Sequence, residues 1–379
     1  MEYIALKDVC KINMGQSPDS LSYNNSEDGI PFFQGNADFG ERYPVTRVWC
    51  NSPTKIAQVE DILISVRAPI GAVNYAKEKC CIGRGLAALT PDKSKVSSEF
   101  IFWLLKGKKA ELNSKGTGST FKAISRRVLE EILVPNIDFN KQHEYAEILG
   151  KTYSVIQVRK QELQQLDNLI KARFVEFFGI PIDNTKNWSM DKAENLCILV
   201  TDGSHFSPKA CDEGYPMLSV KDMRQNGFDY SDCKFVDDET FEILKKQGCV
   251  PQVDDVLIAK DGSYFTRAFT ITEYKDQAIL SSIGMYRPDI DKILPRFLAS
   301  YLMTNEVIEF VNRGYVTGTA LRRVIIKGLK NIPVYIPPLE LQKEFEQFAK
   351  QVDKSKVVVQ AALDKAQLLF DSLMQTYFG

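Results

Sequence analysis

The sequence predicts an α+β fold: two tandem mixed α/β domains and two long antiparallel helices, related by a pseudo-two-fold from an internal duplication. Residues 117–179 align without a gap with residues 317–379, 200 positions further along. Each copy ends in an unbroken apolar pattern with helical spacing, and the segments before the copies share a looser order of strand and helix patterns. A repeat of this length indicates that function should be sought in pairs.

The two copies match at positions spread over their whole length. Both end in Phe-Gly, at Phe178-Gly179 and Phe378-Gly379. The other matches include Thr117 and Thr317, Gly118 and Gly318, Leu129 and Leu329, Ile132 and Ile332, Val134 and Val334, Gln142 and Gln342, Leu163 and Leu363, and Leu169 and Leu369.

The end of each copy predicts a long amphipathic helix. We call the line of core-facing positions along each helix its seam. In the first copy these positions recur every seven residues, and further apolar residues widen the line. In the second copy they are spaced alternately by three and four residues. The first seam is Leu149, Ile156, Leu163, Ile170 and Phe177, widened by Tyr145, Ile148, Val155, Leu166, Leu169 and Phe174. The second comprises positions 345, 348, 352, 355, 359, 362, 366, 369, 373 and 376.

Two such helices in one chain are expected to pack on each other, most simply antiparallel, because a lone apolar stripe aggregates or binds a partner. A helix over 141–178 is roughly 55 Å long at 1.5 Å per residue. The pair is either a hairpin of core helices or a coiled-coil spacer between two copies of a domain. The gapless repeat favours the spacer.

Length and composition predict a folded cytoplasmic protein with no membrane association. The chain has 379 residues, enough for two domains plus helices, and 44% of them are apolar. No apolar run is as long as a membrane span, and the first residues lack a signal-peptide layout. The eight cysteines form no C-x-x-C pair, and the only histidines are His143 and His205. We therefore expect buried, unpaired cysteines, no metal site and no disulfide framework.

The charge is nearly balanced overall, at −1, with a pI of about 6.3. That is not the basic footprint of a typical nucleic-acid binder. Locally, however, residues 101–129 carry an excess of basic side chains over the single acid Glu111. These are Lys106, Lys108, Lys109, Lys115, Lys122, Arg126 and Arg127.

In the first domain, Asp61–Val66 predicts a buried strand and residues 67–71 a loop. Residues 80–82 and 86–89 predict strands on either side of Gly83-Arg84-Gly85, and residues 100–112 predict a helix. The second half repeats this order. The number of residues between matching positions grows along the chain from 185 to 194, 197 and finally 200. Arg67-Ala68-Pro69 is replaced by Asp261-Gly262-Ser263, so one framework with different loops predicts two recognition surfaces of different specificity. Residues 180–187 form the linker.

This arrangement resembles the specificity subunit (HsdS) of type I restriction-modification systems, over the whole chain. The resemblance rests on the tandem order of domain, helix, domain, helix and on the repeated Thr-Gly-Ser/Thr loops that precede Leu-x-x-Ile-x-Val. It also rests on residues 336–342, Ile-Pro-Pro-Leu-x-x-Gln, and on the loop at residues 201–208. The first copy departs from the pattern, with Val-Pro-Asn-Ile-Asp at residues 134–138 in place of a double proline.

The resemblance implies two target recognition domains, at residues 1–139 and 180–337, and two long helices, at 140–179 and 338–379. Each domain would recognise one half of a bipartite site in double-stranded DNA, and the helices would set the spacing. Two methyltransferase (M) subunits would dock on the chain, and restriction (R) subunits would join through them. No cofactor is expected in this subunit; S-adenosylmethionine, ATP and Mg belong to the partners.

Sequence motifs give no support for catalysis by this chain. An adenine-N6 methyltransferase needs Asn/Asp-Pro-Pro-aromatic, but Pro337-Pro338 lies between Ile336 and Leu339. The Gly-rich residues 116–120 lack the lysine of a phosphate-binding loop. Pro91-Asp92 and residues 99–101 lack the lysine of a nuclease motif. The chain is therefore predicted to be a non-catalytic subunit.

DNA contacts are expected from polar and basic loop residues in both halves, with phosphates bound by basic and hydroxyl groups and bases by paired donors and acceptors. Each could instead be an ordinary loop residue or an ion-pair partner. The first-half candidates are Gln16, Ser17, Gln34, Asn36, Arg67, Arg84, Thr117, Ser119 and Lys122. The second-half candidates are His205, Ser219, Lys221, Lys260, Ser263, Arg267, Thr317, Thr319 and Arg322.

Two alternatives stay open at this stage. The chain could serve a modification-only complex, or it could be a non-DNA scaffold that joins two partner-binding domains through a helical hairpin. The near-neutral charge favours the scaffold, and salt-sensitive DNA binding would argue against it.

Overall fold

The computed structural model describes residues 2–118, 122–261, 265–318 and 322–379. The chain forms two compact units, one of residues 1–161 with 360–379 and one of residues 162–359. The long helices α5 (Phe139–Phe178) and α11 (Leu339–Phe378) each contribute to both units. Each unit therefore consists of a mixed α/β domain, the beginning of one long helix and the end of the other.

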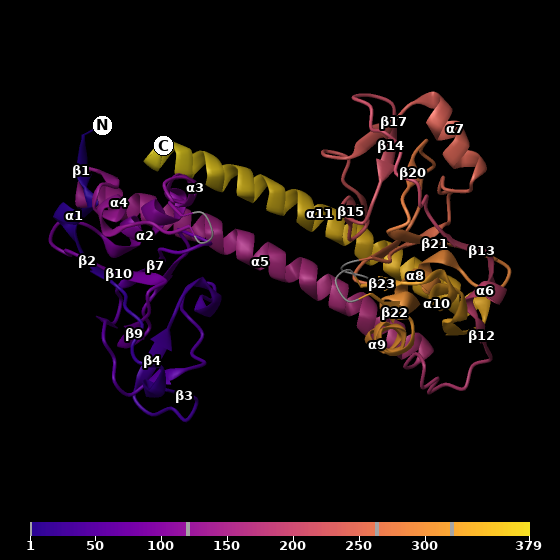
Figure 1. Cartoon of the computed structure of the whole chain (residues 1–379), viewed down its shortest axis with the longest axis horizontal. Helices are drawn as coiled ribbons and strands as arrows, with labels where there is room; N and C mark the ends of the chain where they lie inside the picture. The colour runs from indigo at the N-terminus through magenta and orange to yellow at the C-terminus, as the bar shows by residue number, and fades with distance from the viewer. Residues whose placement is uncertain (1, 119–121, 262–264, 319–321) are drawn as a thin grey trace. The chain divides into compact units, whose positions relative to one another are not determined.

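Unit 1 contains a four-stranded antiparallel sheet and a second, mixed sheet (Figure 1). The first has the order β2 (Cys10–Met14), β10 (Leu86–Pro91), β7 (Ile62–Ser65), β8 (Val73–Tyr75). The second has the order β3 (Tyr23–Asn24), β5 (Trp49–Cys50), β4 (Ile30–Phe33), β9 (Cys80–Ile82), β6 (Ile56–Ala57). A short pair, β1 (Tyr3–Ala5) and β11 (Leu133–Pro135), joins the start of the domain to its end. The predicted strands around residues 61–66, 80–82 and 86–89 are confirmed.

The helices of unit 1 are α1 (Leu6–Val9), α2 (Ser98–Gly107), α3 (Lys109–Ser114) and α4 (Arg126–Glu130). The single helix predicted over residues 100–112 is wrong, because the chain leaves helical geometry at Lys108. A Cβ atom on the preceding Gly107 would lie 2.6 Å from the Cε of Met374 on α11. Glycine thus allows close packing against α11 at the point where α2 ends, and glycine also weakens a helix.

Unit 2 repeats this plan (Figure 1). Its main sheet has the order β13 (Cys197–Asp202), β21 (Ile283–Pro288), β18 (Val256–Ala259), β19 (Ala268–Thr270), and a three-stranded sheet has the order β17 (Lys234–Val236), β14 (Tyr215–Leu218), β20 (Ala278–Ile279). The short pairs are β12 (Met190–Lys192) with β24 (Pro333–Tyr335), β15 (Met223–Arg224) with β16 (Gly227–Phe228), and β22 (Val316–Thr317) with β23 (Arg323–Val324). The helices are α6 (Ala193–Leu196), α7 (Asp238–Lys246), α8 (Pro295–Leu302), α9 (Asn305–Gly314) and α10 (Ile326–Asn331).

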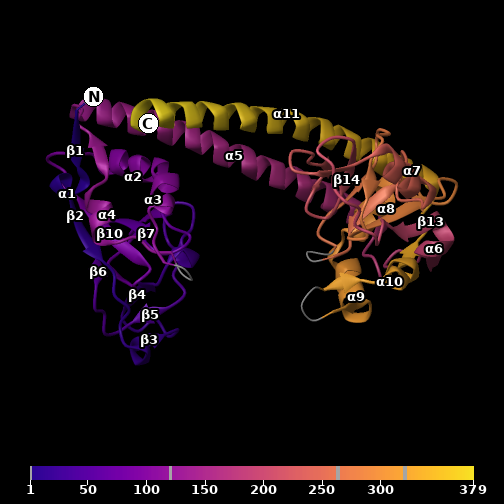
Figure 2. The ribbon, with the colours of Figure 1, turned by 45° about the horizontal axis from the view of Figure 1, so that its top comes forward.

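Within each unit the two long helices run antiparallel (Figure 2). In unit 1, Tyr145 near the start of α5 stacks on Tyr377 at the end of α11, with ring centroids 3.8 Å apart. In unit 2, Phe178 at the end of α5 lies 5.4 Å from Phe345 near the start of α11. The prediction of an antiparallel helix pair is therefore confirmed in both units.

The predicted seam is right for the α5 positions that are spaced by seven residues, and it is partly wrong elsewhere. Leu149, Ile156 and Ile170 are buried, but Val155 and Leu169 are 48% and 45% exposed. On α11 the predicted positions 345, 352 and 359 are buried, whereas Leu369 is 54% exposed. Together with the buried Gln342 and Phe378 near its ends, the buried residues of α11 are Phe345, Ala349, Val352, Lys356, Val359, Leu363 and Phe370. Several of these lie 200 positions after seam residues of α5, so the duplication fixes the seam better than apolarity alone does.

A buried glutamine ties the start of each long helix to its domain. Gln142 Oε1 accepts a hydrogen bond from Ser97 N at 2.8 Å, and its Nε2 donates to Ile137 O at 3.0 Å. Gln342 Oε1 accepts from Leu294 N at 2.8 Å, and its Nε2 donates to Pro337 O at 2.8 Å. Each glutamine thereby satisfies both a backbone N–H at the start of a domain helix and a carbonyl of its own helix entry.

The unit 2 seam also contains an ion pair. Lys356 Nζ lies 2.5 Å from Asp167 Oδ1, with the two side chains 11% and 16% exposed. Gln225 Nε2 donates to the other oxygen, Asp167 Oδ2, at 2.7 Å. The residues 200 positions away are Ile156 and Gln367, so the repeat does not carry this pair in unit 1. A polar pair in an otherwise apolar seam favours one register of the two helices.

The cysteines and the hydropathy pattern agree with a chain packed around apolar cores. All eight cysteines are free thiols, five of them buried and three partly buried, so the prediction of mostly buried cysteines is confirmed. Burial raises the pKa of the Cys10, Cys80 and Cys197 thiols to about 12, which makes them poor nucleophiles. Among the described residues, no helix combines the length and apolarity needed to cross a membrane.

We predict that Gln342→Leu lowers the free energy of unfolding by about 2–4 kcal/mol, because it leaves the Leu294 N–H and the Pro337 carbonyl buried without partners. The exposed Gln351→Leu, on the same helix, is the matched control and should change stability by about 0.5 kcal/mol or less. Urea denaturation followed by circular dichroism measures both. Equal effects would contradict the role assigned to the buried glutamine.

We also predict that Lys356→Ile or Asp167→Gln alone destabilises unit 2 by about 2–3 kcal/mol, because each leaves one charge unpaired in the seam. The double variant installs the residues of the repeat's other copy, and it should cost less than the sum of the single changes. A double-mutant cycle by thermal denaturation tests this. Strict additivity would show that the pair contributes no coupling.

Candidate nucleic-acid interface

In unit 1, three of the predicted contact residues are positioned by one small backbone ladder. Ala123 exchanges two hydrogen bonds with Thr117, at 2.9 and 3.0 Å, and also forms an antiparallel bridge with Arg67. Ala68 N donates to Lys122 O at 3.0 Å, and Ile124 N donates to Val66 O at 2.9 Å. Thr117, Lys122 and Arg67 are therefore neighbours at the end of β7, although 50 residues separate the ladder's two sides.

The glycines around Arg84 allow two backbones to approach closely. Gly85 N donates to Gln34 O, and a Cβ on Gly85 would lie 2.3 Å from that same oxygen. A Cβ on Gly15 would lie 2.1 Å from Gly83 O. Residues larger than glycine would push the strands apart at both places. The Gly-Arg-Gly segment thus binds to the β4 end through its backbone, and the Arg84 side chain is left exposed.

Four predicted contact residues line one hollow of about 220 Å³ in unit 1: Gln34, Asn36, Arg67 and Arg84. Ser17 lies beside it, with its Oγ 3.4 Å from Arg84 N, and the carbonyl of Gln16 accepts a hydrogen bond from Thr54. Neither Arg67 nor Arg84 forms an ion pair within the described part of the chain. Two exposed guanidinium groups beside two side-chain amides provide the paired donors and acceptors that recognise base edges and phosphates.

Unit 2 contains the equivalent ladder with different side chains. Thr317 pairs with Arg323, and Arg323 forms a bridge with Asp261. Val324 N donates to Lys260 O at 3.0 Å, as Ile124 N does to Val66 O in unit 1. The position of Arg67 is thus taken by Asp261, and the position of Ala123 by Arg323. In unit 2 the cationic side chain is therefore Arg323, on the other strand of the bridge, opposite the Asp261 carboxylate.

These residues belong to an ionic network at the end of β18. Lys260 Nζ lies 3.0 Å from Asp202 Oδ2 and 3.7 Å from Asp261 Oδ1. Arg323 lies 3.7 Å from the other oxygen of Asp261, and His205 Nε2 lies 3.2 Å from Asp202 Oδ1. Lysine and both carboxylates are largely buried, whereas His205 and Arg323 are exposed. The network presents a histidine and an arginine to solvent on a buried Asp-Lys-Asp base.

The structure argues against the predicted DNA contact by Lys260. Its side chain is only 4% exposed, and two carboxylates surround its ammonium group. A phosphate contact would require both ion pairs to break in a poorly hydrated position, which is costly. Lys260 therefore positions Asp202 and Asp261, and the outward groups of the same network are His205 and Arg323.

The other unit 2 candidates differ in how far hydrogen bonds within the protein already hold their side chains. The Ser219 hydroxyl donates to Asp222 Oδ2 at 2.9 Å, and exposed Lys221 donates to the carbonyl of Asp232 at 2.7 Å. Arg267 is half-buried, with Nη1 donating to Met223 O at 2.9 Å. Arg322 is exposed beside Arg323. The candidates Ser119, Ser263 and Thr319 lie outside the described residues.

Sequence reasoning missed Asp202, Asp261 and Arg323. Acids are unexpected at a surface that binds a polyanion, so residue type alone does not point to Asp202 or Asp261. A signal was present, since Asp261 replaces Arg67 in the aligned halves and Arg323 replaces Ala123. A charge lost on one strand and gained on the neighbouring position predicts a compensating pair.

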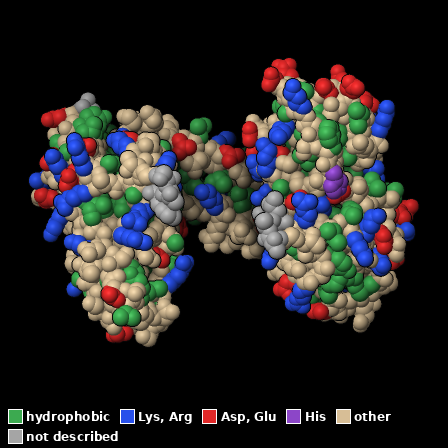
Figure 3. All heavy atoms as spheres, viewed as in Figure 1, with side chains coloured by type: hydrophobic (Ala, Val, Ile, Leu, Met, Phe, Trp, Pro, Cys, Tyr) green, Lys and Arg blue, Asp and Glu red, His purple; other side chains and the backbone are tan. Residues whose placement is uncertain are grey.

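Neither unit carries a large basic patch on the face drawn in Figure 3, where Lys and Arg side chains are interspersed with acids. The described residues include no group of three or more His, Cys, Asp or Glu side chains able to hold a metal ion. We call the surfaces at the end of β7 in unit 1 and at the end of β18 in unit 2 the strand-end edges. Each carries a small number of polar and cationic side chains on rigid strand ends, and these side chains differ between the two units.

We predict that Lys260→Met lowers the free energy of unfolding by about 2–4 kcal/mol, because it leaves two buried carboxylates without their cation. Lys221→Met is the matched control: the Lys221 side chain is half exposed and its hydrogen-bonded partner Asp232 is fully exposed, so its loss should change stability by about 0.5 kcal/mol or less. Chemical denaturation of both variants decides the point. A near-neutral effect of Lys260→Met would mean that its ammonium group does not hold the network.

Comparison with known proteins places this architecture in a family. The model of the type I restriction modification DNA specificity domain matches residues 1–168 and 188–364. A putative type I restriction enzyme MjaX specificity subunit from Methanocaldococcus jannaschii is 44% identical over 161 residues, covering 42% of this chain and 38% of that protein. The EcoBI specificity subunit of Escherichia coli is 21% identical over 99% of this chain and 85% of that protein.

A crystal structure of the type I restriction-modification S subunit from M. genitalium shares the fold. Its TM-score is 0.58 at 14% identity, with 100% of this chain and 96% of that chain covered. The chain spans less than half the length of the MjaX relative in their alignment. Two matches of the domain model, one in each half, together account for most of the sequence. The chain therefore belongs to the family of type I restriction-modification DNA specificity domains, of which it carries two tandem copies.

Proposed function

We propose that this chain is the DNA sequence-specificity subunit of a type I restriction-modification complex. The observation that carries the proposal is the pair of equivalent strand-end ladders with different chemistry, in a chain with two DNA specificity domains. Unit 1 offers Arg67 and Arg84 around a hollow, and unit 2 offers His205 and Arg323 on an ionic network. Each domain recognises one half of a bipartite DNA site, and the two halves differ in sequence.

The long helices have the roles of spacer and docking surface in this proposal. Each has 40 residues, which corresponds to about 60 Å at 1.5 Å per residue. They fix the number of base pairs between the two half-sites. Two methyltransferase subunits dock on the chain, and restriction subunits join through them. Exposed apolar residues on the helices, such as Val158, Val357 and Leu368, supply contact area for such partners.

Catalysis belongs to the partner subunits in this proposal. Methyl transfer from S-adenosylmethionine to adenine N6, and ATP-dependent cleavage with Mg, take place there. In this chain the buried cysteines have raised thiol pKa values, and the polar clusters at the strand ends are held in ion pairs or face solvent. The chain contributes sequence recognition and assembly.

We predict that Arg67→Glu damages recognition of one half-site only. The assay co-expresses the chain with its methyltransferase subunit in a host without other methylation and maps N6-methyladenine by single-molecule sequencing. A bipartite motif is expected for the unaltered chain. Arg67→Glu should relax or abolish one half of it, because an arginine that contacts a base contributes about 1–3 kcal/mol of discrimination. Arg267→Glu should affect the other half.

Lys79→Glu is the matched control for Arg67. Lys79 is exposed just before β9, whereas the hollow lies just after the same strand. It should leave the motif unchanged. Loss of both half-sites in Arg67→Glu would contradict two independent recognition domains. Absence of salt-sensitive DNA binding by the assembled complex would instead favour the non-DNA scaffold, which should show none.

A further inference from the structure

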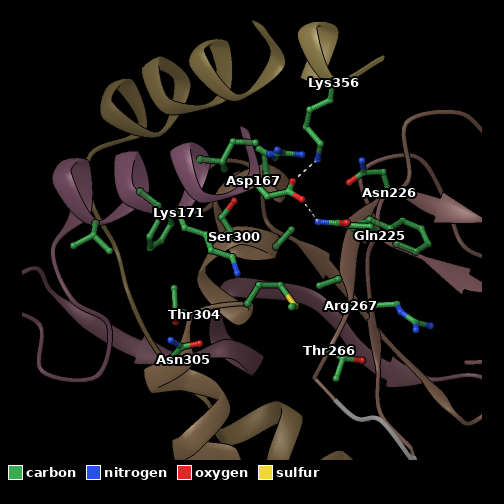
Figure 4. A pocket seen from close by; sticks show the side chains of 18 of the residues that line it. Asp167, Lys171, Gln225, Asn226, Thr266, Arg267, Ser300, Thr304, Asn305 and Lys356 are labelled. Carbon is green, nitrogen blue, oxygen red and sulfur yellow. Dashed lines mark hydrogen bonds and ion pairs between the residues drawn. The ribbon is translucent and has the colours of Figure 1, made fainter. Parts of the chain in front are cut away.

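Unit 2 contains a cavity of about 450 Å³ between the end of α5, the α8–α9 connection and β19 (Figure 4). Its floor is apolar and includes Ile170, Phe174, Phe269 and Met303. Polar side chains surround that floor, among them Asp167, Lys171, Gln225, Arg267 and Asn305. A volume of this size, with an apolar floor and a few fixed polar groups, is typical of small-molecule sites.

Unit 1 shows which side chains occupy the position equivalent to this cavity. Ser97 N and Leu294 N make the same hydrogen bond, to Gln142 and Gln342, so α2 and α8 are equivalent at an offset of 197. Trp103 of unit 1 therefore corresponds to Ser300 of unit 2, and Phe102 corresponds to Ala299. Both small residues line the cavity.

In unit 1 the corresponding space holds an aromatic cluster. Phe102 stacks on Tyr75 at 4.8 Å, and Trp103 packs against Tyr153 at 5.4 Å and against Phe370 at 5.8 Å. Lys106 lies over the Tyr153 ring, 3.6 Å from its centroid. The framework thus accommodates stacked rings and a cation here. At the offsets of 197 and 200, unit 2 lacks four of these rings: Ser300, Ala299, Asp353 and Ile170 replace Trp103, Phe102, Tyr153 and Phe370. The gap is not closed, although an unfilled apolar cavity is destabilising.

The charges around the cavity favour an anion. Asp167 is occupied by Lys356 and Gln225, as the dashed lines of Figure 4 show, and Arg296 pairs with Asp353 at 3.1 Å. Lys171 and Arg267 lie on opposite sides in that view. Within the described part of the chain, neither Lys171 nor Arg267 has an ion-pair partner. In the Arg296–Asp353 pair, one donor (Arg296 Nε) and one acceptor (Asp353 Oδ1) are buried without hydrogen-bond partners, so that pair adds no preference. Glu306 is the one further acid of the lining, so the balance is positive.

We propose that this cavity binds a planar aromatic anion of nucleoside monophosphate size. The ring occupies the space that Trp103 and Phe102 fill in unit 1, on the floor formed by Ile170 and Met303. The anionic group is bound by Lys171 at the rim. The volume suits a whole small molecule better than one inserted side chain. Apart from Arg267, which is also a candidate DNA contact, the lining residues are not part of the strand-end ladder of unit 2, and the proposal does not depend on the proposed function.

Binding is tested on the full chain by calorimetry with AMP, GMP, CMP and UMP at low salt. At least one should bind with a Kd of about 10–100 µM, as expected for a ligand of this size. Adenosine lacks the anion and ribose 5-phosphate lacks the ring, so both should bind at least about tenfold more weakly than the best nucleotide. Failure of all four nucleotides to bind overturns the proposal, as does equal binding of ribose 5-phosphate.

Variants locate the site. Ser300→Trp rebuilds the residue of unit 1 and should abolish nucleotide binding, whereas the matched Ser300→Ala should retain it. Lys171→Met should weaken binding by about tenfold, because a charge-assisted contact is lost. If Ser300→Trp fails to fold, Ala299→Phe, which restores the other ring of unit 1, provides the same test. Nucleotide binding that survives a folded, filled cavity would place the ligand elsewhere and overturn the proposal.

Discussion

The structure depends on how the long helices are shared between the two units. Each unit holds the beginning of one helix through a buried glutamine and the end of the other through a phenylalanine, Phe378 against Phe100 in unit 1 and Phe178 against Phe297 in unit 2. Gln142 and Gln342 satisfy backbone groups that would otherwise be buried without partners. Unit 1 is therefore completed by residues 360–379 from the far end of the sequence, whereas unit 2 is one continuous segment, residues 162–359.

The duplication also explains why the two strand-end edges can differ so much. The ladders that carry them are backbone hydrogen bonds, which constrain position but not side-chain identity. Arg67 and Ala123 in one unit become Asp261 and Arg323 in the other, while the bridge between the strands is kept. In the proposed function, DNA contacts come from a few cations and amides on rigid supports, which the net charge of −1 for the whole chain does not exclude. Membership in a DNA specificity family is therefore compatible with a pI of about 6.3.

Comparison of the two copies also distinguishes residues that fill the core in both units from positions where the two units differ. Where unit 1 fills the space beside its long helix with Trp103, Phe102 and Phe370, unit 2 has a cavity and a seam ion pair, Asp167 with Lys356. Framework positions such as Phe100 and Phe297 are kept, so the differences lie on one face of α2 and α8 and on the long-helix residues beside it. A duplicated chain thus supplies its own reference structure for each local change.

The sequence by itself determined the duplication, the α+β class, the two long helices and most central strands, because gapless repeats, heptad spacing and apolar runs are local signals. It also indicated Gln34, Asn36, Arg67 and Arg84, which the fold brings to one hollow. Tertiary structure decided the rest. Only packing showed that Leu369 faces solvent, that α2 ends before Lys108, and that Lys260 is locked between Asp202 and Asp261. These outcomes depend on what lies opposite each side chain, and that is set by residues far away in the chain.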